Sequence, residues 1–298
     1  MIEISLFGQV CVRADGEVVG GLSGKQRQIL AILALEAGSP VSKERLADLL
    51  WQGSPPSSYI GTLDSYVCVL RRSLGLKAGR SSQLATTEAG FVLRTGDDIH
   101  VDLAAFRGLA ALAEEATSEG VVEAVEGALA LLHGDLLNDV PYADWAVRAR
   151  DSFRREVVEL CLSGAQRANA IGQTGRAARL ARAAIDRDPV CEDAWRQLML
   201  AHWFSGRRGS ALAAYGELRA AMSDYLGDEP GRDSQELYLT ILRDTSDSGT
   251  ETTVDHGSEL RTLLRLLRQA LDCTPGVRAP ARDSALSEVA TRALAAAC

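Results

Sequence analysis

The amino-acid sequence predicts a mainly α-helical fold with a small β component, divided into two domains and a tail. Three patterns support this prediction. Apolar and polar residues alternate over the first twenty positions, as in strands, and apolar residues recur at helical spacing through most of the remaining chain. A short segment also repeats after 34 residues, which is the period of tetratricopeptide helix pairs. The 298 residues are enough for two domains with separate hydrophobic cores.

The predicted N-terminal domain, residues 1–96, begins with short strands. Ile2 and Ile4 share one face of the first strand, and Asp15 followed by Gly16 predicts a hairpin turn before a further strand. The first domain is therefore expected to open with a small antiparallel sheet.

Three helices and a closing hairpin are predicted to complete this domain. The first helix is expected over 26–37, and the second runs from a capping Ser42 to about Trp51. The third is expected over 57–74, and a hairpin over 83–94. Strands, three helices and a final hairpin form the order of a winged helix-turn-helix.

The predicted second domain, residues 101–245, is helical almost throughout. Helices over 103–117 and 121–133 are expected to form an antiparallel pair, followed by a long helix over 144–171. The heptapeptide GQTGRAA that begins at Gly172 matches GRRGSAL 34 residues later. We therefore predict a tetratricopeptide-like bundle.

Residues 246–298 are expected to form a linker and a short helical tail. The segment 245–258 is polar, and helices are predicted over 259–272 and 284–297. Leucines recur at helical spacing in the first of these helices and form an apolar face, which is expected to pack against another surface. Three interpretations stay open: a cap on the repeat bundle, a partner-binding or self-inhibitory arm, or complete disorder.

Composition argues for a soluble cytoplasmic protein without cofactor or metal. No apolar run approaches the roughly 20 residues that a membrane helix needs, and Met1 leads into no signal-peptide pattern. The six cysteines include no C-x-x-C pair, so we expect reduced and mostly buried thiols. The four histidines stand far apart, which argues against a zinc site.

Enzymatic function is not expected. The segment from Gly20 to Lys25 invites comparison with a phosphate-binding loop, but Val19 and Gln26 occupy positions that the motif reserves for glycine and for serine or threonine. No hydrolase elbow, zinc-protease motif or dinucleotide fingerprint occurs in the sequence.

Basic charge concentrates in the N-terminal part of an acidic chain. The net charge is −8, yet nine basic and five acidic side chains lie within 21–94. A local basic patch beside a helix-turn-helix is the electrostatic footprint of a nucleic-acid-binding domain. Four basic side chains near helix starts are candidate phosphate contacts: Lys25, Arg27, Lys43 and Arg45.

The predicted third helix has a face suited to the major groove of DNA. Its apolar stripe, from Leu63 to Leu74, is expected to pack inward, and Asp64 is its single acidic residue. Short polar side chains and an arginine are then turned outward, which permits close approach to base edges, with Arg71 on the flank. The outward residues are Ser58, Thr62, Ser65, Cys68, Val69 and Arg72.

Several runs resemble the Streptomyces antibiotic regulatory protein family. They are LSGKQRQILAILAL (22–35), LADLLW (46–51) and TLDSYVCVLRRSLG (62–75). The downstream runs ADW (143–145) and GRRGSALAAY (206–215) resemble the bacterial transcriptional activator domain found in that family.

The resemblance implies a winged-helix transcriptional activator that binds direct repeats in double-stranded promoter DNA, as a homodimer or a tandem pair. It also implies recruitment of RNA polymerase holoenzyme, at a secondary-metabolite gene cluster. Larger relatives add an ATPase module, which this chain is too short to carry. Where the family commonly has a wing arginine after Gly-Tyr, this chain has Gly90 and Phe91, so Arg94 is the nearest substitute. The resemblance places DNA contacts on Thr62, Ser65, Tyr66, Val69, Arg71 and Arg72, and Thr87 in the hairpin joins this set.

Two other functions remain open on the residues alone. The acidic helical half is compatible with an interaction adaptor whose N-terminal module has lost DNA binding. A repressor that occupies DNA without recruiting polymerase is the other alternative.

Overall fold

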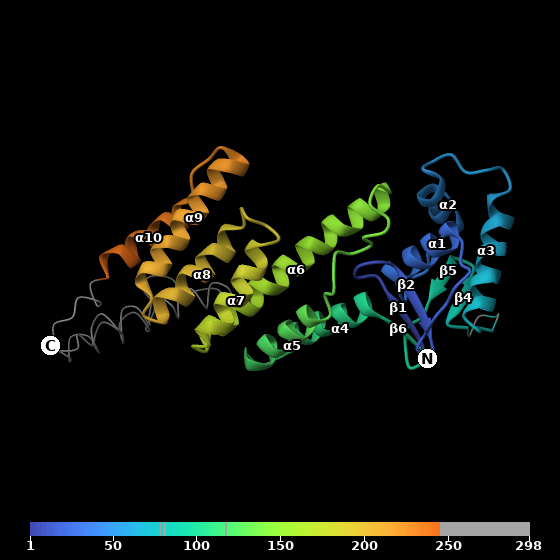
Figure 1. Ribbon diagram of the computed structural model, residues 1–298, viewed down its shortest axis with the longest axis horizontal. Helices are drawn as coiled ribbons and strands as arrows, with labels where there is room; N and C mark the ends of the chain where they lie inside the picture. The colour runs from blue at the N-terminus through green and yellow to red at the C-terminus, as the bar shows by residue number, and fades with distance from the viewer. Residues whose placement is uncertain (78, 80–81, 117, 245–298) are drawn as a thin grey trace, which may run out of the picture. The chain divides into compact units, whose positions relative to one another are not determined.

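The computed structural model describes residues 1–244 except 78, 80, 81 and 117. Figure 1 shows strands and three helices in the N-terminal part, followed by helices only. The mainly helical fold class is confirmed. The N-terminal elements are β1 (Ile2–Ser5), β2 (Cys11–Ala14), β3 (Glu17–Val18), α1 (Gly24–Leu35), α2 (Lys43–Trp51), α3 (Tyr59–Ser73), β4 (Leu84–Thr87), β5 (Gly90–Leu93) and β6 (Ile99–Val101).

Caps set the starts of the first two helices. Ser23 and Gln26 form a reciprocal capping box at α1, so that helix begins at Gly24, two residues before the predicted start. The Ser42 hydroxyl accepts a hydrogen bond from the backbone N–H of Arg45, which confirms the predicted cap of α2.

The strands form two sheets. The larger has the order β3-β2-β1-β6, and β4 pairs with β5 in a separate hairpin. The β6 strand was not predicted. It runs parallel to β1, with Ile2 opposite Ile99 and Ile4 opposite Val101. Residues beyond position 96 thus complete the first sheet, because the apolar side chains of so short a strand are buried only once β1 lies beside it.

The second half is a stack of helices. Residues 177 and 211, which the 34-residue repeat aligns, are both fully buried alanines on α7 and α9. Small side chains at these positions allow neighbouring helices to approach closely. The helices are α4 (Asp102–Glu115), α5 (Ser118–Ala130), α6 (Asp144–Ala170), α7 (Thr174–Ile185), α8 (Glu192–Phe204), α9 (Arg208–Leu226) and α10 (Arg232–Arg243).

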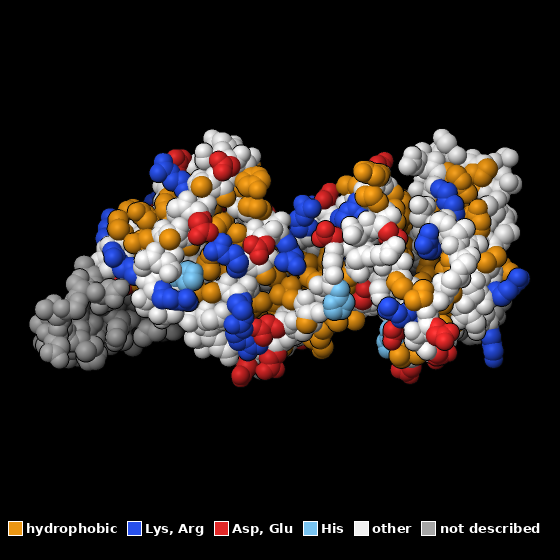
Figure 2. Space-filling view, viewed as in Figure 1, with side chains coloured by type: hydrophobic (Ala, Val, Ile, Leu, Met, Phe, Trp, Pro, Cys, Tyr) orange, Lys and Arg blue, Asp and Glu red, His pale blue; other side chains and the backbone are white. Residues whose placement is uncertain are grey.

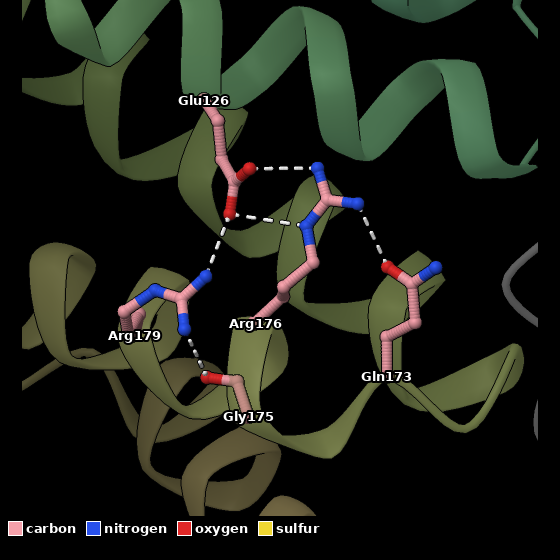
Figure 3. Close-up of polar contacts among 5 residues, drawn as sticks. All are labelled: Glu126, Gln173, Gly175, Arg176 and Arg179. Atoms are coloured by element: carbon pink, nitrogen blue, oxygen red, sulfur yellow. Dashed lines mark hydrogen bonds and ion pairs between the residues drawn. The ribbon is translucent and has the colours of Figure 1, made fainter.

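A carboxylate fastens α5 to α7 (Figure 3). Glu126 accepts two hydrogen bonds from the Arg176 guanidinium, at 3.1 and 2.6 Å, and one from Arg179 at 3.1 Å. The hydrogen bond from Arg176 holds the pKa of Glu126 below its ordinary value of 4.5. Gly164 of α6 lies close by, and a Cβ there would come within 3.0 Å of Leu180 and Val125 side-chain atoms.

The two halves share a junction. The Asp102 carboxylate accepts the backbone N–H groups of Leu6 and Phe7 at 2.8–3.0 Å. The Phe7 ring contacts Phe106 and Phe153, with ring centroids 6.3 and 5.2 Å apart. Met1–Ile241 accordingly form one compact unit. The predicted domain boundary between 96 and 101 lies inside that unit and stays a prediction.

The remaining predictions concern the cysteines, the C-terminal tail and membrane-spanning helices. Of the four cysteines that the structure describes, Cys161 is buried, Cys11 and Cys191 are half-buried and Cys68 is exposed, so the expectation of mostly buried thiols is wrong for these four. The predicted linker and tail helices, over 245–297, lie outside the described residues. Within the described part of the chain, every helix is too short or too polar to cross a membrane.

Candidate nucleic-acid interface

The α3 helix presents one buried and one exposed face. Leu63, Val67 and Leu70 are fully buried, and Leu74 just beyond the helix is nearly so, as the apolar stripe predicted. These leucines and the valine fix the rotation of α3 against α1 and α2 (Figure 1). What remains accessible is therefore set by the packed stripe.

The exposed face differs slightly from the predicted one. Ser65, Cys68 and Arg72 are exposed as expected. Thr62 and Val69 were expected to face outward and are instead half-buried at the edge of this face. Both residues stand one helical turn from Tyr66, which packs against the core, so this side of α3 lies nearer the core than the helical wheel predicted. Ser58 lies exposed immediately before α3, and Tyr66 is half-buried against the core.

The two hydroxyls on α3 are bonded within the helix. Thr62 Oγ1 donates to the Ser58 carbonyl at 3.1 Å, and Ser65 Oγ donates to the Gly61 carbonyl at 2.8 Å. Each oxygen keeps lone pairs directed away from the helix, so it can accept a hydrogen bond from a base amino group.

The two arginines at the end of α3 have different surroundings. Arg71 donates from Nε to the Leu84 carbonyl at 2.8 Å and from a terminal nitrogen to Thr86 Oγ1 at 2.7 Å. It therefore ties α3 to the β4 strand. Arg72 is exposed, and its guanidinium makes no hydrogen bond or ion pair with the described residues.

The β4–β5 hairpin is the wing of the fold. Thr87 Oγ1 donates to the Gly90 carbonyl at 3.0 Å within the turn. Arg94 follows β5 and donates to the Ser82 carbonyl at 3.0 Å. Both predicted wing residues thus have intramolecular partners, which hold the hairpin in shape.

Three of the four predicted phosphate contacts also have intramolecular partners. The Lys25 ammonium donates to the Leu50 carbonyl at the end of α2 and lies over the Trp51 ring. The Lys43 ammonium pairs with Asp64 of α3 at 2.7 Å, and Arg45 pairs with Glu36 at 3.2 Å.

Arg27 is the exception, because it is exposed and its side chain is unpaired among the described residues. On the face shown in Figure 2, Lys and Arg side chains are spread over the region of α1–α3, while acidic ones of this part gather near the N-terminus. These Lys and Arg side chains lie apart from one another on this face, so the local basic patch stays a prediction.

Sequence reasoning missed the pairing of Lys43 with Asp64 and the bracing role of Arg71. Lys43 and Asp64 stand 21 residues apart on different helices. No local signal relates positions at that separation, since only the crossing of α2 and α3 brings them together.

Comparison with known proteins identifies the two halves. Residues 17–91 match the C-terminal domain of transcriptional regulatory proteins, and residues 101–242 match the bacterial transcriptional activator domain. The regulatory protein DnrI of Streptomyces peucetius is 32% identical over 255 residues, which cover 81% of this chain and 92% of DnrI. The chain belongs to the Streptomyces antibiotic regulatory protein family.

Further relatives extend this picture of the Streptomyces antibiotic regulatory protein family. The regulatory protein AfsR of Streptomyces coelicolor is 30% identical over 81% of this chain but only 24% of its own length. The solved structure of Mycobacterium tuberculosis EmbR, in complex with a low-affinity phosphopeptide, matches with a TM-score of 0.69. It is 24% identical and covers 93% of this chain and 73% of EmbR, so it shows the fold. The winged helix-turn-helix and the helical activator domain are confirmed, and this family consists of DNA-binding transcriptional activators.

Proposed function

We propose that this protein activates transcription by binding two direct repeats in promoter DNA and recruiting RNA polymerase holoenzyme. Residues 1–96 act as the DNA-binding domain and 101–245 as the activator domain. The regulated genes belong to a secondary-metabolite biosynthesis cluster, as membership of the Streptomyces antibiotic regulatory protein family supports. The single observation that carries DNA binding is the exposed face of α3.

The chemistry of that face suits a major groove. Short side chains at Ser65 and Cys68 let the helix backbone approach base edges closely. The unpaired guanidinium of Arg72 has the fork geometry that binds guanine O6 and N7, or a phosphate, bidentately. Thr62, Tyr66 and Val69 line the edge of the same face.

Phosphate contacts position α3 on the duplex. Arg27 needs to break no intramolecular pair to reach a phosphate, whereas Lys25, Lys43 and Arg45 must exchange or share their partners. We therefore expect Arg27→Ala to reduce the slope of log affinity against log salt by about one. Replacement of Lys25 is expected to change this slope less.

Tandem binding follows from the direct-repeat arrangement. Two copies bound about one helical turn apart, roughly 34–36 Å, lie on the same side of the duplex and can touch. The acidic balance of the helical half keeps it away from phosphate.

The loop before α6 supports a partner-binding role for the helical half. Tyr142 is 91% exposed, and Val147 on the first turns of α6 is 40% exposed. Arg150 holds this loop by donating to the carbonyls of Leu137, Val140 and Pro141 at 2.7–3.3 Å. Figure 2 shows apolar side chains gathered at this end of α6. Exposed aromatic side chains are enriched at protein interfaces, so we propose the polymerase contact here.

An electrophoretic shift on promoters of the chain's own gene neighbourhood tests DNA binding. Arg72→Ala is expected to weaken binding, and changes at Thr62 or Ser65 to alter base preference by about 1–3 kcal/mol per lost contact. Arg167→Ala is the matched control, because Arg167 is an exposed arginine on α6 without a side-chain partner among the described residues. Promoter binding that survives deletion of residues 57–74 overturns the proposal.

Transcription in vitro with the cognate polymerase separates activation from repression or mere occupancy. Tyr142→Ala is expected to lower activation while DNA affinity stays unchanged. If residues 1–100 alone activate as well as the full chain, the assignment of the helical half is wrong.

A further inference from the structure

Arg107 brings three helices together at one guanidinium. It lies on α4 and donates from Nε and a terminal nitrogen to both oxygens of Glu156 on α6, at 3.1 and 3.0 Å. Its other terminal nitrogen donates to the backbone carbonyl of Leu35 at 3.0 Å. Leu35 is the last residue of α1, so the cation also faces the negative end of that helix dipole.

This contact belongs to the part of the junction where α4 packs against α1 of the winged-helix domain. Asp102 and the Phe7 cluster attach the helical half to β1. The loop after α5 attaches to the same strand region, through the Leu137 N–H and the Leu6 carbonyl at 2.8 Å. Among the described residues, Arg107 makes the one polar contact between α1 and the helical half.

Moving α1 means moving α3. The two helices pack against each other, and Leu30 and Leu33 of α1 are fully buried together with Leu63 and Val67 of α3. A close-packed core transmits displacement, because its side chains have no room to absorb it. Whatever fixes the end of α1 therefore fixes the direction of the DNA-facing helix.

We propose that Arg107, held by Glu156, is a positioning residue that sets the angle between the DNA-binding helix and the activator half. This inference rests on the proposed function. Its consequence is a sharp dependence of activation on promoter spacing. Each base pair inserted between the DNA site and the polymerase rotates a rigid activator by about one tenth of a turn. Without the Arg107 contact, the activator half can change its angle to the DNA-binding domain and still reach the polymerase after an insertion. Activation then depends less on promoter spacing.

The first test measures transcription in vitro on promoters whose site is shifted one base pair at a time. The full chain is compared with Arg107→Ala, Glu156→Gln and the control Arg219→Ala. Arg219 forms a similar but more exposed double contact with Glu229, at 2.9 Å, between α9 and the turn before α10. The control therefore loses a similar ion pair without touching α1.

Arg107→Ala is expected to lower activation at the native spacing by about 2- to 30-fold and to broaden the spacing profile. Glu156→Gln, which keeps one acceptor, is expected to fall between this variant and the wild type. Binding to a single DNA site and melting temperature are expected to match those of Arg219→Ala, because partly exposed ion pairs contribute little to stability.

The second test measures the angle directly and does not depend on activation. Spin labels at Asp48→Cys on α2 and Ala213→Cys on α9, in a full chain with its native cysteines replaced, give a distance distribution between the two halves. Arg107→Ala is expected to widen this distribution, and Arg219→Ala to leave it unchanged.

An unchanged distance distribution in Arg107→Ala overturns the inference, as does equal widening in the control. The inference is also overturned if the wild type activates transcription and Arg107→Ala shows the same dependence of activation on spacing. If the wild type activates at no spacing, the proposed function fails, and the distance distribution alone decides the role of Arg107.

Discussion

Replacement of Gly90 by alanine tests the contact between the wing and the helix-turn-helix. Gly90 begins β5 with a φ of +128°, a backbone conformation that side chains disfavour. An added Cβ would lie 2.6 Å from the Val41 carbonyl carbon, 2.7 Å from Ser42 Cα and closer still to the Val41 oxygen. The approach is this close because Phe91 and Val41 exchange both backbone hydrogen bonds, at 2.8 and 3.0 Å.

The cost of Gly90→Ala has two parts. Holding a non-glycine residue in this region of φ costs about 1–3 kcal/mol, and overpacking against fixed backbone costs about another 1–3 kcal/mol. For a unit of this size, each kcal/mol lowers the melting temperature by about 2–4 °C. The variant is therefore expected to lose about 2–6 kcal/mol and to melt roughly 4–24 °C below the wild type.

Thermal unfolding of the full chain, followed by calorimetry, measures this loss. Gly216→Ala is the matched control. Gly216 lies inside α9 with no atom within 4 Å of an added Cβ, so this change is expected to stabilise by up to about 1 kcal/mol. A Gly90→Ala protein that melts within about 1 °C of the wild type refutes the close-approach argument.

Three further predictions concern the brace, the ion pair and the thiols. Arg71→Ala removes the contacts to Leu84 and Thr86. It is expected to cost about 1–2 kcal/mol in chemical unfolding and to weaken DNA binding, and a variant with unchanged DNA affinity contradicts the bracing role. Hydrogen bonding from Arg176 lowers the pKa of Glu126 in the folded protein, so its stabilisation is present above its ordinary value of 4.5 and is lost as pH falls through the lowered pKa. Glu126→Gln should therefore lower the unfolding free energy at pH 7 by about 1 kcal/mol or less, since the carboxylate is partly exposed, with the difference from wild type vanishing in acid; a difference that grows in acid speaks against this. Maleimide should modify exposed Cys68 quickly and Cys161 slowly, since burial raises the pKa of Cys161 to about 11. Bound promoter DNA should protect Cys68, and equal labelling with and without DNA argues against an α3 interface.

Local patterns in the sequence predicted most of the helices. The stripe from Leu63 to Leu74 places α3 and its buried face because helical spacing requires one side to pack. Ser42 predicted the start of α2 for a similarly local reason, since its hydroxyl serves a backbone N–H only three residues away.

The repeat at Ala177 and Ala211 predicted paired helices because small residues at a fixed period mark close helix contacts. Class and family follow from such short-range patterns. They do not say how the packed helices meet the strands.

Tertiary structure decided the features that join distant positions. The β6 strand exists as a strand because β1, nearly a hundred residues earlier in the chain, supplies its hydrogen-bond partner. Arg71 is a brace rather than a free cation because the wing folds back onto α3. Arg107 meets Leu35 only after α4 has packed beside α1. The periodicity of apolar side chains predicts the helix or strand in which they lie. Contacts between residues 70 or more positions apart depend on which elements pack together, and no local pattern encodes that packing.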